Sequence, residues 1–227
     1  MKWIAKNETS PLISFYLTLC SLVFLFTFLI ILLVEPIQLH SKVNSFHSTY
    51  FDYFFSMITH LGDGMCAILI CIILFFRNTM LAIKMMLALL LISLLIWISK
   101  FYLFPDANRP VAVFRDLGKP LYIINHVKMN LSRTFPSGHA STAFLIGCTL
   151  AYLSEKIWWQ LLCASFSIMV AFSRVYLSQH FTEDVLAGGI IGLVITFLVL
   201  HPKLNWRKYL DGVKLNKNTP KNTIHAN

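Results

Sequence analysis

The chain has 227 residues, of which 57% are hydrophobic and only 13% are charged. Soluble domains of this size rarely have such a composition, which instead favours a protein embedded in a membrane. The formal net charge is +9, but the cations gather in a loop and in a C-terminal tail beside apolar segments. This distribution indicates contact with anionic lipid and not with nucleic acid.

Six apolar segments follow one another along the chain, at 11–34, 65–76, 80–98, 140–153, 158–172 and 185–200. A bilayer core of about 30 Å needs roughly 20 helical residues, so the shorter segments cross it only if neighbouring polar residues join the helix. We therefore predict an all-α, polytopic membrane protein with six transmembrane helices. It is expected to form a single domain over residues 1–227, in which 203–227 is a basic cytoplasmic tail.

Other features of these segments have plain structural interpretations. The aromatic stretch 44–60 predicts a short interfacial helix or an aromatic belt. Small residues recur at four-residue spacing from Ala143 to Ala151, and again at Gly188 and Gly192, which indicates close packing between helices. The five cysteines lie singly within apolar runs and lack CxxC spacing, so we expect neither a disulfide framework nor a metal site.

The first polar motif follows the third apolar segment and contains Lys100 and Arg109-Pro110. Cations at a helix end often snorkel to the membrane interface, and taken alone this motif predicts no more than that. A role in binding an anion depends on the other two motifs.

The second polar motif, Pro136-Ser137-Gly138-His139, opens the fourth apolar segment. Ser137 is the natural N-cap of a helix whose first N–H groups and dipole attract an anion. Gly138 lets the backbone approach a phosphate, and His139 is placed to donate a proton to a leaving oxygen. The plainer alternative is a turn that starts a transmembrane helix, with an interfacial histidine.

The third polar motif joins the fifth and sixth segments and contains Ser173, Arg174, His180 and Asp184. The four-residue spacing places His180 and Asp184 on one helical face, where a carboxylate bonded to one ring nitrogen leaves the other as a nucleophile. Arg174 offers a planar fork that matches phosphate oxygens. The alternative, acids that only complement the first turn of a helix, explains neither His180 nor Arg174.

All three motifs are expected at one membrane face, because the ends of odd-numbered spans and the starts of even-numbered spans lie on the same side of a bilayer. Residues as distant as Arg109 and Asp184 can then share one pocket. Cations, two histidines and a carboxylate together suit the attack of an imidazole on a phosphoryl group. The pattern therefore indicates a membrane-embedded phosphatase.

The motifs resemble the signature of the type 2 phosphatidic acid phosphatase superfamily, which is Lys-x6-Arg-Pro, Pro-Ser-Gly-His and Ser-Arg-x5-His-x3-Asp. The second and third motifs match at every specified position. The first departs, because eight residues separate Lys100 from Arg109, and Tyr102 occupies the place of the family lysine. Either residues 104–108 loop out by two, or Lys100 is not the phosphate ligand.

This resemblance implies a helical core of the type 2 phosphatidic acid phosphatase kind and a role for each matched residue. His180 would be the nucleophile that forms a phosphohistidine, Asp184 would orient it, and His139 would protonate the leaving group and then activate water. The residues that would hold the phosphoryl oxygens are Lys100, Arg109, Ser137, Gly138 and Arg174. No metal ion and no cofactor are implied.

We therefore expect an integral-membrane hydrolase that acts on a phosphate monoester or pyrophosphate of a lipid, with undecaprenyl pyrophosphate as the expected substrate. Lipid A phosphates and phosphatidylglycerophosphate are alternatives, and a lipid phosphotransferase would use the same site. A transporter with an anion site needs cations but no oriented nucleophile, so the His-Asp pair disfavours it. Neither nucleic acid nor an obligate protein partner is indicated.

The distribution of Lys and Arg predicts the orientation. With six spans the termini share a side. When Lys100, Arg109 and Arg174 are left out as site residues, 11 cations fall on that side and 5 on the other. By the positive-inside rule the termini are cytoplasmic. We expect a bacterial cell (inner) membrane protein with its active site on the periplasmic or extracellular face.

Overall fold

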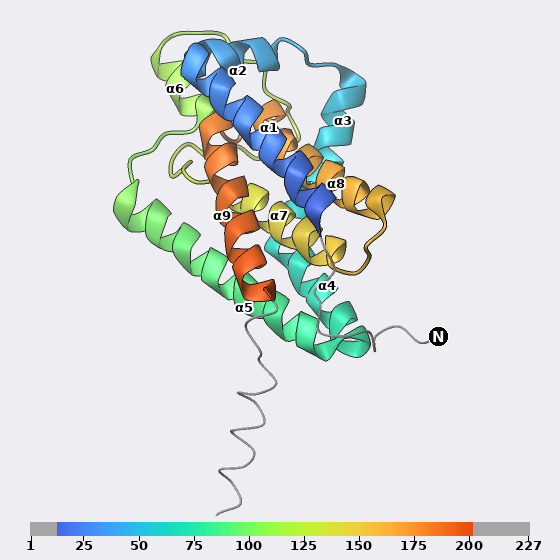
Figure 1. The fold of residues 1–227 in the computed structure, drawn as a ribbon. Helices are drawn as coiled ribbons and strands as arrows, with labels where there is room; N and C mark the ends of the chain where they lie inside the picture. The colour runs from blue at the N-terminus through green and yellow to red at the C-terminus, as the bar shows by residue number, and fades with distance from the viewer. Residues whose placement is uncertain (1–12, 202–227) are drawn as a thin grey trace, which may run out of the picture. The chain divides into compact units, whose positions relative to one another are not determined.

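In the computed structural model, which describes residues 13–201, the chain forms helices and loops, and this range contains no strand (Figure 1). The α-helices are α1 (Ser14–Leu33), α2 (Pro36–Asn44), α3 (Thr49–Ile58), α4 (Gly64–Arg77), α5 (Thr79–Ile98), α6 (Pro110–Asp116), α7 (Gly138–Ala151), α8 (Ile157–Tyr176) and α9 (Thr182–Leu200). A 3-10 turn, η1 (Thr59–Gly62), follows α3, and a π-helical turn, η2 (Ser99–Leu103), extends α5. The all-α prediction is confirmed, whereas the predicted tail 203–227 lies outside the described residues.

Four helices in this range are long and apolar enough to cross a membrane, namely α1, α5 with η2, α8 and α9. A fifth candidate exists if α3 with η1 and α4, which are bent by 55° relative to each other, count as one span. The fourth predicted span is α7, which has only 14 residues, about 21 Å of helix against a bilayer core of about 30 Å. The chain is thus a multi-pass membrane protein, and the predicted count of six spans is not confirmed.

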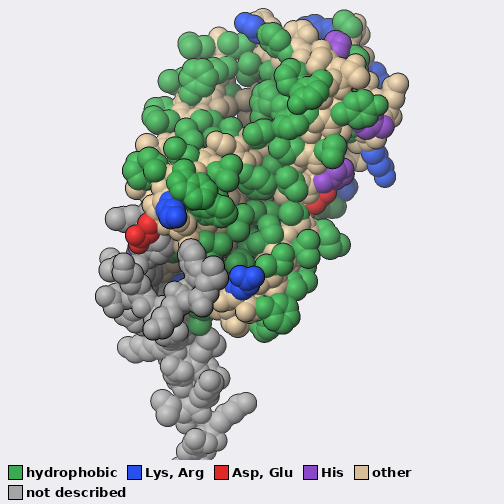
Figure 2. All heavy atoms as spheres, turned by 90° about the vertical axis from the view of Figure 1, so that its right-hand side faces the viewer, with side chains coloured by type: hydrophobic (Ala, Val, Ile, Leu, Met, Phe, Trp, Pro, Cys, Tyr) green, Lys and Arg blue, Asp and Glu red, His purple; other side chains and the backbone are tan. Residues whose placement is uncertain are grey.

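The outer surface of the bundle supports this conclusion. α1, α4 and α5 expose many large apolar side chains, among them Phe26, Leu69 and Leu94. Figure 2 shows a face on which hydrophobic side chains cover most of the surface and charged side chains are few. Such an extended apolar surface is unusual for a protein in water and suits contact with lipid.

The short helix α7 lies at the centre of the bundle, where it contacts α8 and α9 most extensively and also reaches α4, α5 and η1. A Cβ atom at Gly188 or Gly192 would collide with the backbone of Ser137 or Ser141, and one at Gly147 would collide with a side chain of α8. The predicted close packing at these glycines is therefore confirmed. Because protein surrounds α7 on all sides, this helix need not match the thickness of the membrane.

The helices α2, α3 and α6 gather at the end of the bundle where α1 and α8 finish and α9 begins (Figure 1). The aromatic stretch predicted as an interfacial helix forms α3, which exposes Tyr50 and Tyr53 and buries Asp52. Asp52 accepts hydrogen bonds from Tyr176 at 2.6 Å and Tyr122 at 2.8 Å. These bonds tie the loop that carries Tyr122 to α3 and α8, and that loop leads into the second polar motif.

Candidate active site

His180 lies in the loop between α8 and α9, and only 1% of the residue is exposed. Its Nδ1 is 3.1 Å from the hydroxyl oxygen of Thr134 and 3.4 Å from Oδ2 of Asp184. Thr134 donates its single proton to Asp184 at 2.5 Å. The hydroxyl must therefore accept from His180, which places the ring proton on Nδ1 and leaves the lone pair on Nε2.

Asp184 also organises the start of α9. Its Oδ2 accepts a hydrogen bond from the backbone N–H of Phe181 at 2.8 Å, and its carbonyl oxygen accepts one from the N–H of Ser137 at 2.9 Å. The first bond satisfies a backbone donor at the helix N-terminus, as first-turn carboxylates do. Asp184 therefore both caps its helix and faces His180, so the two sequence interpretations of this residue are compatible.

Arg109 is buried and is held by the loop that precedes His180. Its Nη1 donates to the backbone oxygen of Gln179 at 2.8 Å and to Oε1 of the same residue at 3.2 Å, while Nε donates to the Ser132 oxygen at 3.2 Å. These bonds fix the plane of the guanidinium beside His180. None of them uses Nη2.

Arg174, at the end of α8, donates from Nη1 to the hydroxyl of Thr59 at 2.7 Å. Its Nε is buried and has no hydrogen-bond partner among the described residues. A buried donor left unpaired is costly and rare in folded proteins. An anionic ligand at this position would satisfy it.

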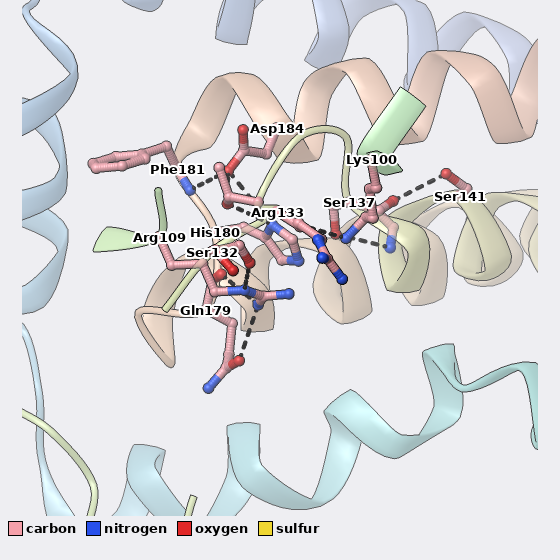
Figure 3. Close-up of polar contacts among 12 residues, drawn as sticks. Lys100, Arg109, Ser132, Arg133, Ser137, Ser141, Gln179, His180, Phe181 and Asp184 are labelled. Atoms are coloured by element: carbon pink, nitrogen blue, oxygen red, sulfur yellow. Dashed lines mark hydrogen bonds and ion pairs between the residues drawn. The ribbon is translucent and has the colours of Figure 1, made fainter. Parts of the chain in front are cut away.

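Lys100 of the first motif lies in the π turn η2 and reaches the site from there. Lys100 donates to the backbone oxygen of Arg133 at 3.0 Å and lies near enough to Arg109 and Asp184 for their charges to interact; Figure 3 shows it reaching toward this cluster. Tyr102 is 68% exposed and packs on Trp97 instead. A π turn holds one more residue than an α turn, so η2 takes up one of the two extra residues of this spacing. Lys100, not Tyr102, contacts the cluster.

The second motif forms the predicted helix start. Ser137 is the N-cap of α7, and its buried hydroxyl accepts from the N–H of Ala140 at 3.4 Å. A Cβ on Gly138 would meet only a side-chain carbon of Ile96 at 3.7 Å, so protein atoms do not crowd this position. His139 is less buried than His180, because 31% of its side chain is exposed.

The electrostatic setting of His180 follows from this arrangement. Burial lowers the pKa of His180 well below its ordinary value, and the charges of Arg109, Arg174 and Lys100 and the nearby His139 act in the same direction. The ring is therefore neutral near pH 7 and keeps the lone pair that a nucleophile needs.

Four side chains in contact with these residues were missed in the sequence, namely Thr59, Asp63, Thr134 and Gln179. Thr134 lies two residues before the second motif, and Gln179 lies within the third, directly before His180. A hydroxyl or amide side chain in a loop does not by itself indicate a functional site. Thr59 and Asp63 lie just before the second apolar segment. The start of an even-numbered span belongs to the motif face, so the same argument that grouped the motifs would have included them.

The sequence also matches known proteins. Residues 81–208 match the family model of the PAP2 superfamily. The chain is 30% identical to undecaprenyl-diphosphatase BcrC of Bacillus subtilis over 78 residues, which are 34% of this chain and 39% of that protein. It is 28% identical to lipid A 4'-phosphatase of Bacteroides thetaiotaomicron over 160 residues, 68% of this chain and 71% of that protein. The match to BcrC thus spans only about two fifths of that relative.

The fold has a counterpart among solved structures. The crystal structure of a transmembrane PAP2-type phosphatidylglycerolphosphate phosphatase from Bacillus subtilis superposes with a TM-score of 0.61 at 23% identity, and the match covers 91% of this chain and 98% of that one. The family model extends over more than half of the chain and includes the convergent residues from Lys100 to Asp184. On this agreement of sequence and fold, the chain belongs to the PAP2 superfamily.

Proposed function

We propose that this protein is an integral-membrane phosphatase that hydrolyses a phosphate monoester or pyrophosphate of a lipid. The observation that carries the proposal is the buried, neutral His180, whose Nδ1 faces Thr134 and Asp184 and whose Nε2 is left as the nucleophilic atom. The nearby Arg174 has a buried Nε that lacks a partner among the described residues, as expected for a site that binds an anion.

In the first step, Nε2 of His180 attacks phosphorus, and the bond between phosphorus and the leaving oxygen breaks. His139 gives its proton to that oxygen, which departs as the alcohol or as the lipid monophosphate. Asp184 and Thr134 keep the ring in the correct tautomer and stabilise the charge that develops on it, as a carboxylate does for other catalytic histidines. The product of this step is a phosphohistidine.

In the second step, the neutral His139 takes a proton from water as the water oxygen attacks phosphorus. The bond between phosphorus and Nε2 breaks, and inorganic phosphate leaves. The negative oxygens are held in both steps by Lys100, Arg109, Ser137, Gly138 and Arg174. Nη2 of Arg109 and Nε of Arg174 have no hydrogen-bond partner within the described part of the chain. Preorganised donors of this kind stabilise developing charge.

Undecaprenyl pyrophosphate is the proposed substrate, in line with the name of the relative BcrC. The lipid A 4'-phosphatase aligns with more of the chain and supplies the first alternative, lipid A phosphate. The structural neighbour supplies the second, phosphatidylglycerophosphate. We propose cytoplasmic termini and a site on the outer face, since this assignment agrees with the positive-inside rule.

The test is phosphate release by purified protein from undecaprenyl pyrophosphate, phosphatidylglycerophosphate and lipid A, with His180→Ala as the inactive control. Release without an acceptor lipid supports a phosphatase, and release that persists in excess chelator supports metal independence. Transfer to an added lipid without free phosphate would instead identify a phosphotransferase. Failure to form either phosphate or a phosphoenzyme with all three lipids would contradict the proposal.

The orientation has a separate test. A membrane-impermeant thiol reagent applied to intact cells should label a cysteine introduced at Ser132, beside Arg109, and spare one introduced at Asn218. The native cysteines are buried or partly buried, and their background is measured in the unmodified protein. The reverse labelling pattern would contradict the proposed orientation.

A further inference from the structure

The turn that leads into α4 borders the site, although none of the three polar motifs includes its residues. η1 ends at Gly62, and Asp63 is the N-cap residue of α4. A Cβ atom on Gly62 would lie 2.9 Å from the backbone oxygen of His139 and 2.9 Å from the side chain of Val170. The backbone at Gly62 therefore passes directly against the first turn of α7, and this close approach brings Asp63 to His139.

Two side chains of this turn contact the proposed catalytic machinery. Asp63 Oδ1 lies 2.6 Å from Nε2 of His139, and Oδ2 lies 3.1 Å from Nδ1 of His60. Four residues earlier, the hydroxyl of Thr59 accepts from Arg174. Asp63 is not needed to cap α4, because its side chain makes no capping hydrogen bond. Its carboxylate is instead directed at two histidines.

We propose that Asp63 is a positioning residue that holds His139 for proton transfer, an assignment that rests on the proposed phosphatase function. A carboxylate that accepts from Nε2–H fixes the tautomer of the neutral ring, so Nδ1 becomes the nitrogen that exchanges a proton. Its negative charge also favours the protonated ring. That form is required in the first step, when the leaving oxygen takes a proton.

The other charges around His139 make this contribution necessary. Arg174 on α8 and Lys100 on η2 place positive charge near the ring, and His180 lies close enough to interact with it. His60 on η1 reaches it only through Asp63. Among the described residues, Asp63 is the one carboxylate in contact with this ring. Burial and these cations hold the pKa of His139 below its ordinary value even beside Asp63, which opposes the shift. Removal of the carboxylate would therefore leave still less of the ring in the protonated form that acts as the acid.

The test compares Asp63→Asn with the wild type on a lipid phosphate and on an aryl phosphate, whose leaving group needs no proton. For the lipid, kcat should fall about tenfold or more, the lower end of general acid catalysis, with little change in KM. The high-pH limb of the kcat profile should also move down by about one pH unit. For the aryl phosphate, the rate of the first step, measured as aryl alcohol released in a single turnover, should change by less than about twofold, since this step needs no acid.

Two further variants exclude a purely structural explanation. Asp63→Glu keeps the charge and should restore most of the high-pH limb, while Asp116→Asn removes a carboxylate that is exposed and paired only with Arg115 and should resemble the wild type. On a His139→Ala background, Asp63→Asn should cause no additional loss, because residues that act through one another are not additive.

Equal losses for both substrates in Asp63→Asn, or a full additional loss on the His139→Ala background, would overturn the inference and leave Asp63 with a role in folding. The same holds if Asp63→Asn matches the wild type on the lipid. A wild type that releases no phosphate would refute the proposed function instead, so the two failures are distinguishable.

Discussion

The two histidines of the site each face a carboxylate, but their surroundings are opposite. His180 is buried and reaches Asp184 at 3.4 Å with the hydroxyl of Thr134 alongside. The side chain of His139 is 31% exposed and contacts Asp63 directly at 2.6 Å. A nucleophile needs a fixed, neutral ring, whereas a proton carrier must meet both the leaving group and water. The difference in burial therefore matches the proposed division of labour.

The backbone supports the two rings differently as well. The loop before His180 contains Ser178, a residue with a positive φ of 52°, whose hydroxyl contacts His40 at 3.1 Å and Asn44 at 3.2 Å. α2 thus holds the His180 loop from outside the site. His139 instead belongs to the first turn of α7 and is fixed through the neighbouring turn at Gly62. The loop of His180 is thus held from several sides, whereas the ring of His139 has one ion-pair partner among the described residues, Asp63.

The largest expected effect tests the nucleophile. His180→Ala removes the ring that we propose as the nucleophile, so turnover should fall by about four orders of magnitude or more. No acid-labile phosphoenzyme should form with labelled substrate in a rapid-quench experiment. Phosphoenzyme that persists in this variant would reverse the roles given to the two histidines.

The second effect separates the proton carrier from the nucleophile. In His139→Ala, turnover of a lipid phosphate should fall by roughly 10²- to 10³-fold, within the range of general acid–base catalysis. With an aryl phosphate the first step should partly survive, and the phosphohistidine should accumulate because no base activates water. Rapid quench measures both steps. If the variant loses the first step equally with both substrates, His139 is not the acid that protonates the leaving group.

A smaller effect concerns the cation contributed by the first motif. Lys100→Ala should lower turnover about tenfold or more, the scale of a lost charge-assisted hydrogen bond. Tyr102→Phe is the matched control at the family position and should be nearly silent, because this side chain points away from the site. Phosphate release by each variant is measured and compared with that of the wild type. A damaging Tyr102→Phe with a silent Lys100→Ala would contradict the placement of Lys100.

The smallest effect sharpens the contrast between the two carboxylate contacts. Thr134→Val removes the hydroxyl between His180 and Asp184 while keeping a β-branched side chain of similar shape. The loss of about one hydrogen bond should lower kcat roughly five- to tenfold with KM unchanged, and Thr134→Ser should retain most of the activity. An impaired Thr134→Ser beside an unaffected Thr134→Val would show that the methyl group, not the hydroxyl, matters at this position.

Much of the site was predictable because its signals are local. Ser137 caps α7 and Asp184 stands in the first turn of α9 as expected, since capping depends on a few adjacent residues. Because successive spans cross the membrane in alternate directions, the end of an odd-numbered span and the start of the next lie on one face. These two arguments are sufficient to group Arg109, His139, Arg174 and His180 before any packing is known.

The sequence by itself determined the helical class, the membrane setting and the membership of the three motifs, because apolar runs and helix-end residues act over short distances. Tertiary structure alone decided which way side chains point and what lies between them. At the end of α5, Lys100 and not Tyr102 faces the site. The hydroxyl of Thr134 lies between His180 and Asp184, and the contact at Gly62 brings Asp63 to His139. These outcomes depend on how helices far apart in the chain pack together, and no local pattern encodes that packing.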